Sequence, residues 1–381
     1  MGEVLLAIDV GGSTSRAYLV DRMGNCLGHG RNRGGNPASN NPDFAAASII
    51  AAVEGAVADA GGGPFDITIA QIALAGPEAH VARAKLEEAF RRLGLSGAIV
   101  FAGDLLAMFA SVTPAMDGYC VVAGTGAGAI RIRGGAIDRV VDLAGWQLGD
   151  LGSGYWLGHE AAKAAAAEME GRGEPTALTG ALLEALNIPR PRDLLPSPLR
   201  GGWRQPGGGG QRTPSVWPTP APNPSPQGGG EPTVPLGEAS IQGRSAALRL
   251  FIDAIYALRP IELARFAPLV IAHRGDAVAD RLIAEAERYL TRDFSIAFDR
   301  SMPGPVVLGG GVIAHLTGLP TAIDEVIRAA GLKSDIRTVT DGSVGAIVLA
   351  LRATGVPVDE AMLNRVAISV AEHGRKSDAA V

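Results

Sequence analysis

Apolar runs of strand length open the chain and are joined by short polar turns. Helical spacing of apolar residues follows over 43–60 and 78–93, and Asn41-Pro42-Asp43 supplies a start signal for the first of these helices. A meander followed by alternating helices and strands indicates a mixed sheet with helices on its faces. The strands expected in this half are Val4–Asp9, Ala17–Asp21, Cys26–Gly30, Ile67–Ala75 and Ala98–Ala102.

The same order of patterns restarts after Asp117-Gly118. Strands are expected at Tyr119–Ala123, Ala129–Arg133, Ile137–Leu143 and Pro305–Leu308. Helices are expected at 155–169, 241–257, 260–266, 276–293, 319–330 and 342–353. Both halves therefore follow one plan, which indicates an internal duplication.

Residues 196–237 interrupt the second half. These 42 residues include 11 Pro and 10 Gly, so no helix or strand period survives, and we interpret them as a disordered insertion that serves as a linker. The domain prediction is an N-terminal lobe over 1–115 and a C-terminal lobe over 116–356 that contains the insertion. A C-terminal helix and tail follow over 357–381.

Composition narrows the class of protein. The chain has 381 residues, 47% hydrophobic and 19% charged, with 34 Lys and Arg against 39 Asp and Glu. Such a chain can bury a sizeable core and has no general basic field, so we expect no nucleic-acid partner. Its two cysteines favour a reducing compartment, and no apolar stretch predicts a membrane span or a signal peptide. We therefore expect a cytoplasmic protein.

Three glycine-rich turns follow predicted strands. The first, Gly11-Gly12-Ser13-Thr14, comes directly after Asp9; the other two are Gly124-Thr125-Gly126 and Gly309-Gly310-Gly311. Turns of this kind let backbone amides approach a phosphate, although a single glycine turn more often joins strands without any ligand. None has the spacing of a Walker A loop or a dinucleotide-binding fingerprint. Three turns at equivalent places in a duplicated layout favour a bound nucleotide.

In order, these turns resemble the first phosphate, second phosphate and adenosine motifs of the sugar kinase/actin superfamily. The stretch Gly145-Trp-Gln-Leu-Gly-Asp-Leu-Gly-Ser-Gly-Tyr-Trp-Leu-Gly158 resembles the signature of the N-acetylglucosamine and glucosamine kinases. That branch also contains the ATPase activators of benzoyl-CoA reductase and 2-hydroxyacyl-CoA dehydratase. The resemblance implies an α/β protein with a two-lobed, duplicated ribonuclease H-like ATPase fold and mixed five-stranded sheets flanked by helices. It further implies a kinase that phosphorylates the 6-hydroxyl of an amino sugar with ATP and Mg²⁺.

The resemblance also implies roles for single residues. Asp104 matches the general base that takes the proton of the sugar hydroxyl, and it would contact the sugar as well. Asn36, Thr125 and Asp150 match sugar-binding positions, and Asp9 matches the carboxylate that organises Mg²⁺. The chain departs from the family pattern at two positions: Leu151 stands where many members have Glu, and Ala127 stands where Ser is frequent.

Reasoning from the residues alone leaves alternatives open. Asp104 suits the N-cap of a helix over 105–112, and Asp150 and Asn36 suit turns. Trp146, Tyr155 and Trp156 are interpreted as packing residues. An activator would need clustered cysteines for an iron–sulfur centre, and Cys26 and Cys120 are 94 positions apart. A kinase-like sugar sensor is the third hypothesis, and a homodimer is the expected assembly.

Overall fold

A computed structural model of the protein describes residues 3–12, 14–36, 41–74, 82–189 and 244–379. The predicted insertion at 196–237 lies outside the described residues, as does Ser13. The chain divides into two compact units. The larger contains Met1–Lys163 with Leu258–Val381 and holds both β-sheets, and the smaller spans Ala164–Ala257.

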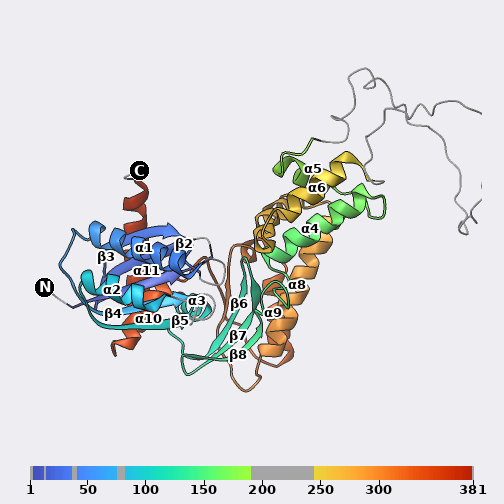
Figure 1. Ribbon diagram of the computed structural model, residues 1–381. Coiled ribbons are helices and arrows are strands. Elements are labelled where there is room, and N and C mark those ends of the chain that lie inside the picture. Colours follow the sequence, from blue (N-terminus) through green and yellow to red (C-terminus); the bar gives the residue numbers. More distant parts are fainter. Residues whose placement is uncertain (1–2, 13, 37–40, 75–81, 190–243, 380–381) are drawn as a thin grey trace, which may run out of the picture. The chain divides into compact units, whose positions relative to one another are not determined.

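The first sheet contains the predicted meander and two parallel strands (Figure 1). Its order is β3-β2-β1-β4-β5; β1 pairs antiparallel with β2 and parallel with β4, and β2 pairs antiparallel with β3. All five strands were predicted. Their bounds are β1 (Glu3–Val10), β2 (Thr14–Asp21), β3 (Cys26–Arg33), β4 (Asp66–Leu74) and β5 (Leu95–Gly103).

The second sheet repeats this plan in the order β10-β9-β6-β7-β8. Strands β6, β7 and β8 form an antiparallel meander, and β9 pairs parallel with β6, as β4 does with β1. The predicted duplication is therefore confirmed. The bounds are β6 (Gly118–Ala123), β7 (Ala127–Arg133), β8 (Ala136–Asp142), β9 (Val306–Gly309) and β10 (Ile336–Val339).

Helices cover both faces of the first sheet. On one face, α1 (Pro42–Asp59) and α2 (Arg83–Arg92) bury Ile49, Phe90 and their neighbours against the inward side chains of β1 and β4. On the other, α10 (Ser343–Ala353) and α11 (Glu360–Ala379) pack on Leu5, Tyr18 and Val20. The side chain of Asn41 accepts from the amide of Asp43 at the start of α1, which confirms the predicted start signal.

Helix α3 (Asp104–Ala110) contacts both sheets. Leu105 and Phe109 pack in the core of the second sheet, whereas Ala107 belongs to the core of the first. A Cβ at Gly345 of α10 would lie 1.7 Å from the carbonyl oxygen of Ala107, so only glycine allows this close crossing of the two helices. The domain prediction assigns residues 343–353 to the second lobe, but in the structure α10 packs on the first sheet.

The longest of the remaining helices in the larger unit packs against β6, β7 and β8 of the second sheet. The predicted 276–293 helix is α8 (Ala277–Ala297), capped by Asp276, and its Phe294 meets Tyr119 of β6 edge to face. The others are α4 (Gly154–Met169, which runs into the smaller unit), the 3₁₀ helix η4 (Pro260–Phe266), α7 (Ala267–Ala272), the 3₁₀ turn η5 (Ile313–His315) and α9 (Leu319–Ala329). The smaller unit holds α5 (Ala177–Ala185) and α6 (Ala246–Tyr256).

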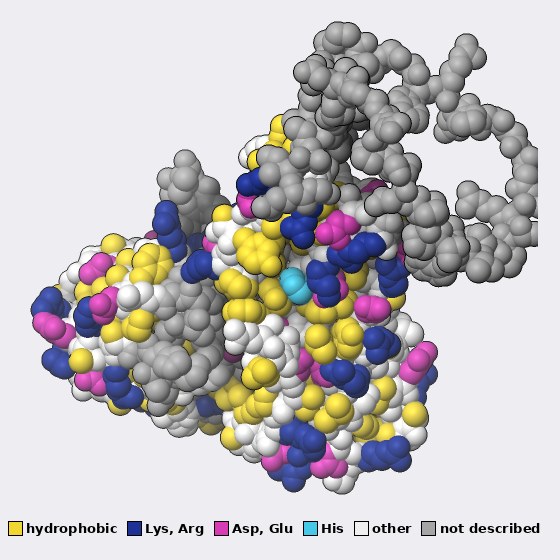
Figure 2. Space-filling view, turned by 45° about the vertical axis from the view of Figure 1, so that its right-hand side comes forward, with side chains coloured by type: hydrophobic (Ala, Val, Ile, Leu, Met, Phe, Trp, Pro, Cys, Tyr) yellow, Lys and Arg dark blue, Asp and Glu magenta, His cyan; other side chains and the backbone are white. Residues whose placement is uncertain are grey.

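Surface character varies little across the visible face of the protein. Figure 2 shows basic and acidic side chains interspersed with apolar ones on the described residues of that face. Among the described helices, none is both long enough and apolar enough to cross a membrane.

Candidate active site

The first glycine turn joins β1 to β2. Its backbone is closed by the amide of Gly11, which donates to the carbonyl of Thr14 over 2.9 Å. Strand β1 delivers Asp9 to the mouth of this turn, with only 6% of its surface exposed. A carboxylate is therefore held next to a backbone turn, as the sequence predicts.

Asp9 is a buried carboxylate that lies close to one positive and one further negative side chain. Arg16 Nη1 is 3.4 Å from its carboxylate, and Arg16 Nη2 is 3.8 Å from the carboxylate of Asp341. Burial, and then the neighbouring negative charge of Asp341, raise the pKa of Asp9 to about 7, although Arg16 acts in the opposite direction. A Cβ at Gly342 would lie 2.9 Å from Asp9 Oδ1. Arg16 alone therefore does not compensate the negative charge of the two carboxylates, and a further cation would stabilise them.

The second glycine turn is joined to the start of α4. The carbonyls of Gly124 and Thr125 accept from the amides of Gly154 and Tyr155 over 2.7 and 3.3 Å. Gly124 N–H donates to the carbonyl of Gly126 over 2.9 Å, and the side chain of Thr125 is exposed. The turn therefore has a fixed backbone and a hydroxyl available to a ligand.

Asp150 is buried beside this second turn. Its Oδ1 accepts from the amide of Ala127 over 3.1 Å, and its φ is +60°. The carboxylate of Asp142 accepts from the amides of Asp150 and Leu151 over 2.7 and 3.2 Å, which holds the strained loop. Burial raises the pKa of Asp150. The turn interpretation is thus correct for the backbone, but the side chain also points at the predicted phosphate loop.

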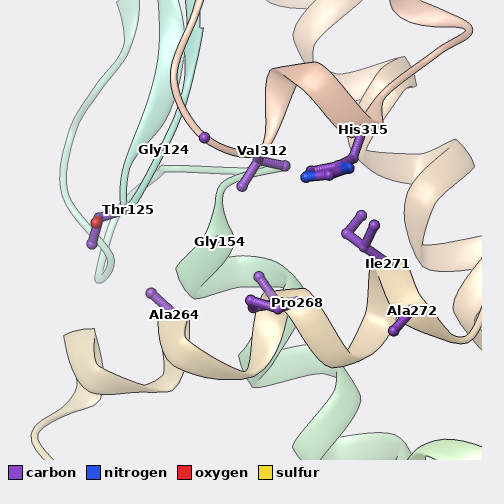
Figure 3. Close-up of a pocket in the computed structure, with 11 residues that line it drawn as sticks. Gly124, Thr125, Gly154, Ala264, Pro268, Ile271, Ala272, Val312 and His315 are labelled. Carbon is purple, nitrogen blue, oxygen red and sulfur yellow. The ribbon is translucent and has the colours of Figure 1, made fainter. Parts of the chain in front are cut away.

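The third glycine turn shares a pocket with the second. After β9 the chain turns at Gly310, with φ +102°, and Val312 N–H donates to the carbonyl of Ala123 over 2.9 Å. The pocket has a volume of about 480 Å³ (Figure 3). Its lining includes Gly124, Thr125, Gly154, Pro268, Gly311 and His315. Two turns that are about 185 positions apart in sequence therefore face one cavity, large enough for a nucleotide.

One glycine in each turn has no structural reason to be glycine. At Gly12, Gly124 and Gly311, no atom lies within 4 Å of the place where a Cβ would stand. None of the three has a positive φ. In contrast, Gly310 needs its left-handed backbone, and a Cβ there would lie 2.5 Å from the carbonyl oxygen of Ala123. The open space at the first three positions suits the close approach of a ligand to the backbone.

Asp104 is the first residue of α3 and follows Gly103, which is the N-cap. Its carboxylate accepts from the amide of Leu105 over 2.9 Å, and it is half-buried. Burial raises the pKa of Asp104, and its charge contributes to the raised pKa of Asp9. Asp104 therefore stabilises the first turn of α3 without being its N-cap, and it lies within electrostatic reach of Asp9.

Asn36 follows the end of β3 and is half-buried. Sequence reasoning did not single out Arg16, Asp142, Asp341 or His315. Asp341 directly precedes the helix expected at 342–353, and its place beside Arg16 and Asp9 depends on packing of α10 against β1. Among the described residues there is no group of three His, Cys, Asp or Glu side chains that could hold a metal. Asp9 and Asp341 nevertheless fit Mg²⁺, which one or two carboxylates and the phosphates of a nucleotide commonly hold.

Known proteins resemble the chain in sequence and in fold. Over 133 residues it is 32% identical to an N-acetylmuramic acid/N-acetylglucosamine kinase of Clostridium acetobutylicum; the match spans 34% of this chain and 43% of that protein, less than half its length. A candidate N-acetylglucosamine kinase of Chromobacterium violaceum superposes with a TM-score of 0.62 at 19% identity, over 92% of this chain and 99% of that one. One from Porphyromonas gingivalis gives 0.57 at 18% identity, with the same coverage.

These structural likenesses show the fold, which is the sugar kinase/actin-type ATPase fold expected from the sequence. A family model covers much more of the chain than the relative from Clostridium does. It matches residues 6–350, a range that includes all three glycine turns and both sheets apart from the first three residues of β1. The chain therefore belongs to the BadF/BadG/BcrA/BcrD ATPase family.

Proposed function

We propose that the protein is an ATP-dependent kinase that phosphorylates the 6-hydroxyl of an amino sugar. The observation that carries this proposal is the pocket lined jointly by Gly124, Thr125 and Gly311, beside turns that leave open space for a ligand. Family membership supports the use of ATP. The sequence similarity to the N-acetylmuramic acid/N-acetylglucosamine kinase of Clostridium acetobutylicum supports a sugar as the acceptor.

In this proposal each of the three turns binds a different part of the nucleotide. Gly11, Gly12, Ser13 and Thr14 bind phosphate from the side of the first sheet, and Gly124, Thr125 and Gly126 bind it from the second. Gly309, Gly310 and Gly311 face the adenosine. Backbone amides at such turns stabilise the charge that spreads over the phosphoryl oxygens during transfer. Asp9, together with Asp341, would hold Mg²⁺, which supplies charge neutralisation when bound.

Asp104 is the proposed general base. A carboxylate that accepts the proton of the acceptor hydroxyl lets the oxygen attack the γ-phosphorus as the bond to the leaving ADP breaks. A raised pKa makes the ionised carboxylate a stronger base, and burial supplies this shift. The amide of Leu105 donates to one oxygen of the carboxylate and orients it, and in this proposal the second oxygen faces the substrate.

Asn36, Thr125, Asp104 and Asp150 are the proposed sugar-binding residues. One oxygen of Asp150 is already engaged by the amide of Ala127, so its second oxygen is the one offered to a sugar hydroxyl. The apolar Leu151 replaces a carboxylate that a free ammonium would favour. We therefore propose N-acetylglucosamine over glucosamine, since burying an ammonium without a partner costs more than burying an acetyl methyl.

The competing proposal, an activator that passes electrons to a partner reductase, needs accessible thiolates. Both cysteines are buried, Cys26 on β3 and Cys120 on β6. Burial raises the pKa of Cys26 to about 12, which disfavours the thiolate that an iron–sulfur cluster requires. The kinase proposal has no such requirement. A homodimer and a cytoplasmic location complete the proposal.

The deciding experiment is ATP consumption by the full chain over a panel of hexoses and amino sugars, with Mg²⁺ present. We expect turnover with N-acetylglucosamine, and a product whose phosphorus resonance couples to the C6 protons. The matched control is Asp104→Asn, which should lower turnover by roughly two to four orders of magnitude and leave folding intact. ATP consumption that is independent of every sugar would contradict the kinase assignment and favour an ATPase role.

A further inference from the structure

We propose that His315 is the residue that binds the base of the nucleotide, in a slot whose other side chains are apolar and therefore select adenine. This inference rests on the proposed function, because it concerns the same nucleotide pocket. It goes beyond that function by naming the chemical basis on which the phosphoryl donor is chosen.

The pocket has two distinct ends (Figure 3). Thr125 and Gly124 lie at one end and His315 at the other, so phosphates at the second glycine turn would direct the base toward His315. Val312 and the His315 ring form one wall, and Pro268 and Ile271 of α7 face them across the cavity. A flat ring between two such walls gains dispersion and apolar burial on both faces.

Most side chains that line the pocket are apolar, and few can form hydrogen bonds. Among the described residues that line the pocket, Thr125 and His315 are those whose side chains carry oxygen or nitrogen; the others are Gly, Ala, Pro, Ile or Val. Thr125 lies at the glycine-turn end, so His315 is the side chain that can hydrogen-bond to the base. A neutral imidazole has one donor and one acceptor nitrogen and can therefore pair with one edge group of adenine.

Guanine suits this lining less well than adenine. Its N1–H and its 2-amino group both need acceptors and its 6-oxo group needs a donor, and a single imidazole can satisfy one of these three groups. The alanine, proline and isoleucine side chains satisfy none, and an unpaired polar group in an apolar site is costly. The slot thus disfavours guanine by its apolar walls and retains adenine by the bond to His315.

The backbone of His315 is fixed from the opposite wall. Arg274 follows α7, and its guanidinium donates to the carbonyl of His315 across 41 positions of sequence. This bond ties the end of η5 to the end of α7, so the two walls of the slot are linked directly. Arg274 is accordingly a positioning residue for the His315 ring.

The test is equilibrium binding of fluorescent N-methylanthraniloyl ADP and GDP to the full chain, without sugar, so that the readout does not depend on turnover. We expect the wild type to bind the ADP derivative at least about tenfold more tightly than the GDP derivative. His315→Ala should weaken ADP binding about tenfold, which equals about 1.4 kcal/mol. His315→Asn, which keeps a donor and an acceptor, should recover part of that loss, whereas His315→Phe should not.

The matched control is His373→Ala, which changes a histidine of α11 that does not line the pocket. His315 is exposed, so thermal melting should show each variant folded. Equal wild-type affinities for both nucleotides would overturn the selectivity. Full recovery by His315→Phe, or no effect of His315→Ala, would overturn the role of the imidazole while the kinase proposal stands. Absence of binding by either nucleotide to the wild type would overturn both proposals.

Discussion

Asp9→Asn should make the protein more stable, and more so at alkaline pH than at acid pH. The folded protein holds Asp9 in a buried place beside Asp341, which raises the pKa of its carboxyl from 3.8 to about 7. The unfolded chain therefore releases this proton at lower pH than the folded protein does. Between these two pKa values the folded state binds more protons, so its stability falls as pH rises.

The structure sets the size of this effect. Each unit of pKa difference corresponds to about 1.36 kcal/mol, so the shift costs the folded protein about 4 kcal/mol once both states are ionised, near pH 8. At pH 5 the unfolded carboxyl is ionised while the folded one keeps its proton, and the cost falls to about 2 kcal/mol. Asparagine has nearly the same shape and removes the titration, so the variant should gain about these amounts.

Urea unfolding followed by circular dichroism at both pH values measures the two differences. Glu54→Gln is the matched control, because Glu54 is exposed on α1 and its substitution should change stability little at either pH. The reasoning is refuted if Asp9→Asn is no more stable than the wild type at pH 8, or if its advantage is the same at pH 5. A variant that is more stable but inactive would identify Asp9 as a residue kept for function at the expense of stability.

Four further tests address the site and the chain organisation. Asp104→Asn should lower kcat by roughly two to four orders of magnitude with ADP binding nearly intact, and near-wild-type turnover would leave Asp104 a helix residue only. The ratio of kcat/KM for N-acetylglucosamine to that for glucosamine should be about ten or more and should fall in Leu151→Glu; an unchanged ratio would mean that residue 151 faces away from the amino group. Excision of residues 196–237 should leave the melting temperature and activity almost unchanged, because Pro- and Gly-rich sequence contributes little apolar burial, and loss of soluble protein would refute this. Gly311→Ala should preserve stability and weaken nucleotide binding at least about tenfold, whereas Gly310→Ala, at φ +102°, should destabilise the fold, and melting curves with ADP titrations distinguish the two.

Much of the fold could be predicted because its strands are buried and its turns carry glycine. Runs such as Val4–Asp9 have the apolar density of a central strand, and the repeat of one pattern revealed the duplication. Strand β10 was missed because its sequence, Ile336–Val339, is short and has two polar residues. The partner of α10 was also missed, since the contact of Gly345 with Ala107 joins residues 238 positions apart and has no local signal.

The site was predictable where it lies on motifs and not where it depends on packing. The turns around Gly12, Gly124 and Gly311 were found from their spacing after strands. Asp341 was not, because nothing in its own neighbourhood indicates that α10 brings it to within 3.8 Å of Arg16. His315 lies four residues after Gly311, the last glycine of the third turn. Its local sequence gives no sign of a ligand, and only the tertiary structure places it in a pocket.

The open space beside Gly12, Gly124 and Gly311 implies that the fold alone does not require glycine at these positions. In a turn that both residues can adopt, alanine stabilises a protein by about 0.4–1 kcal/mol relative to glycine, because the unfolded chain has fewer conformations. Since the fold leaves room for a methyl group at all three positions, selection for stability alone would replace them. A descendant that has lost its nucleotide should therefore drift to alanine there first, while Gly310 and Gly345 remain. The presence or absence of glycine at these positions would then distinguish, from sequence alone, homologues that bind a nucleotide from homologues that have lost this binding.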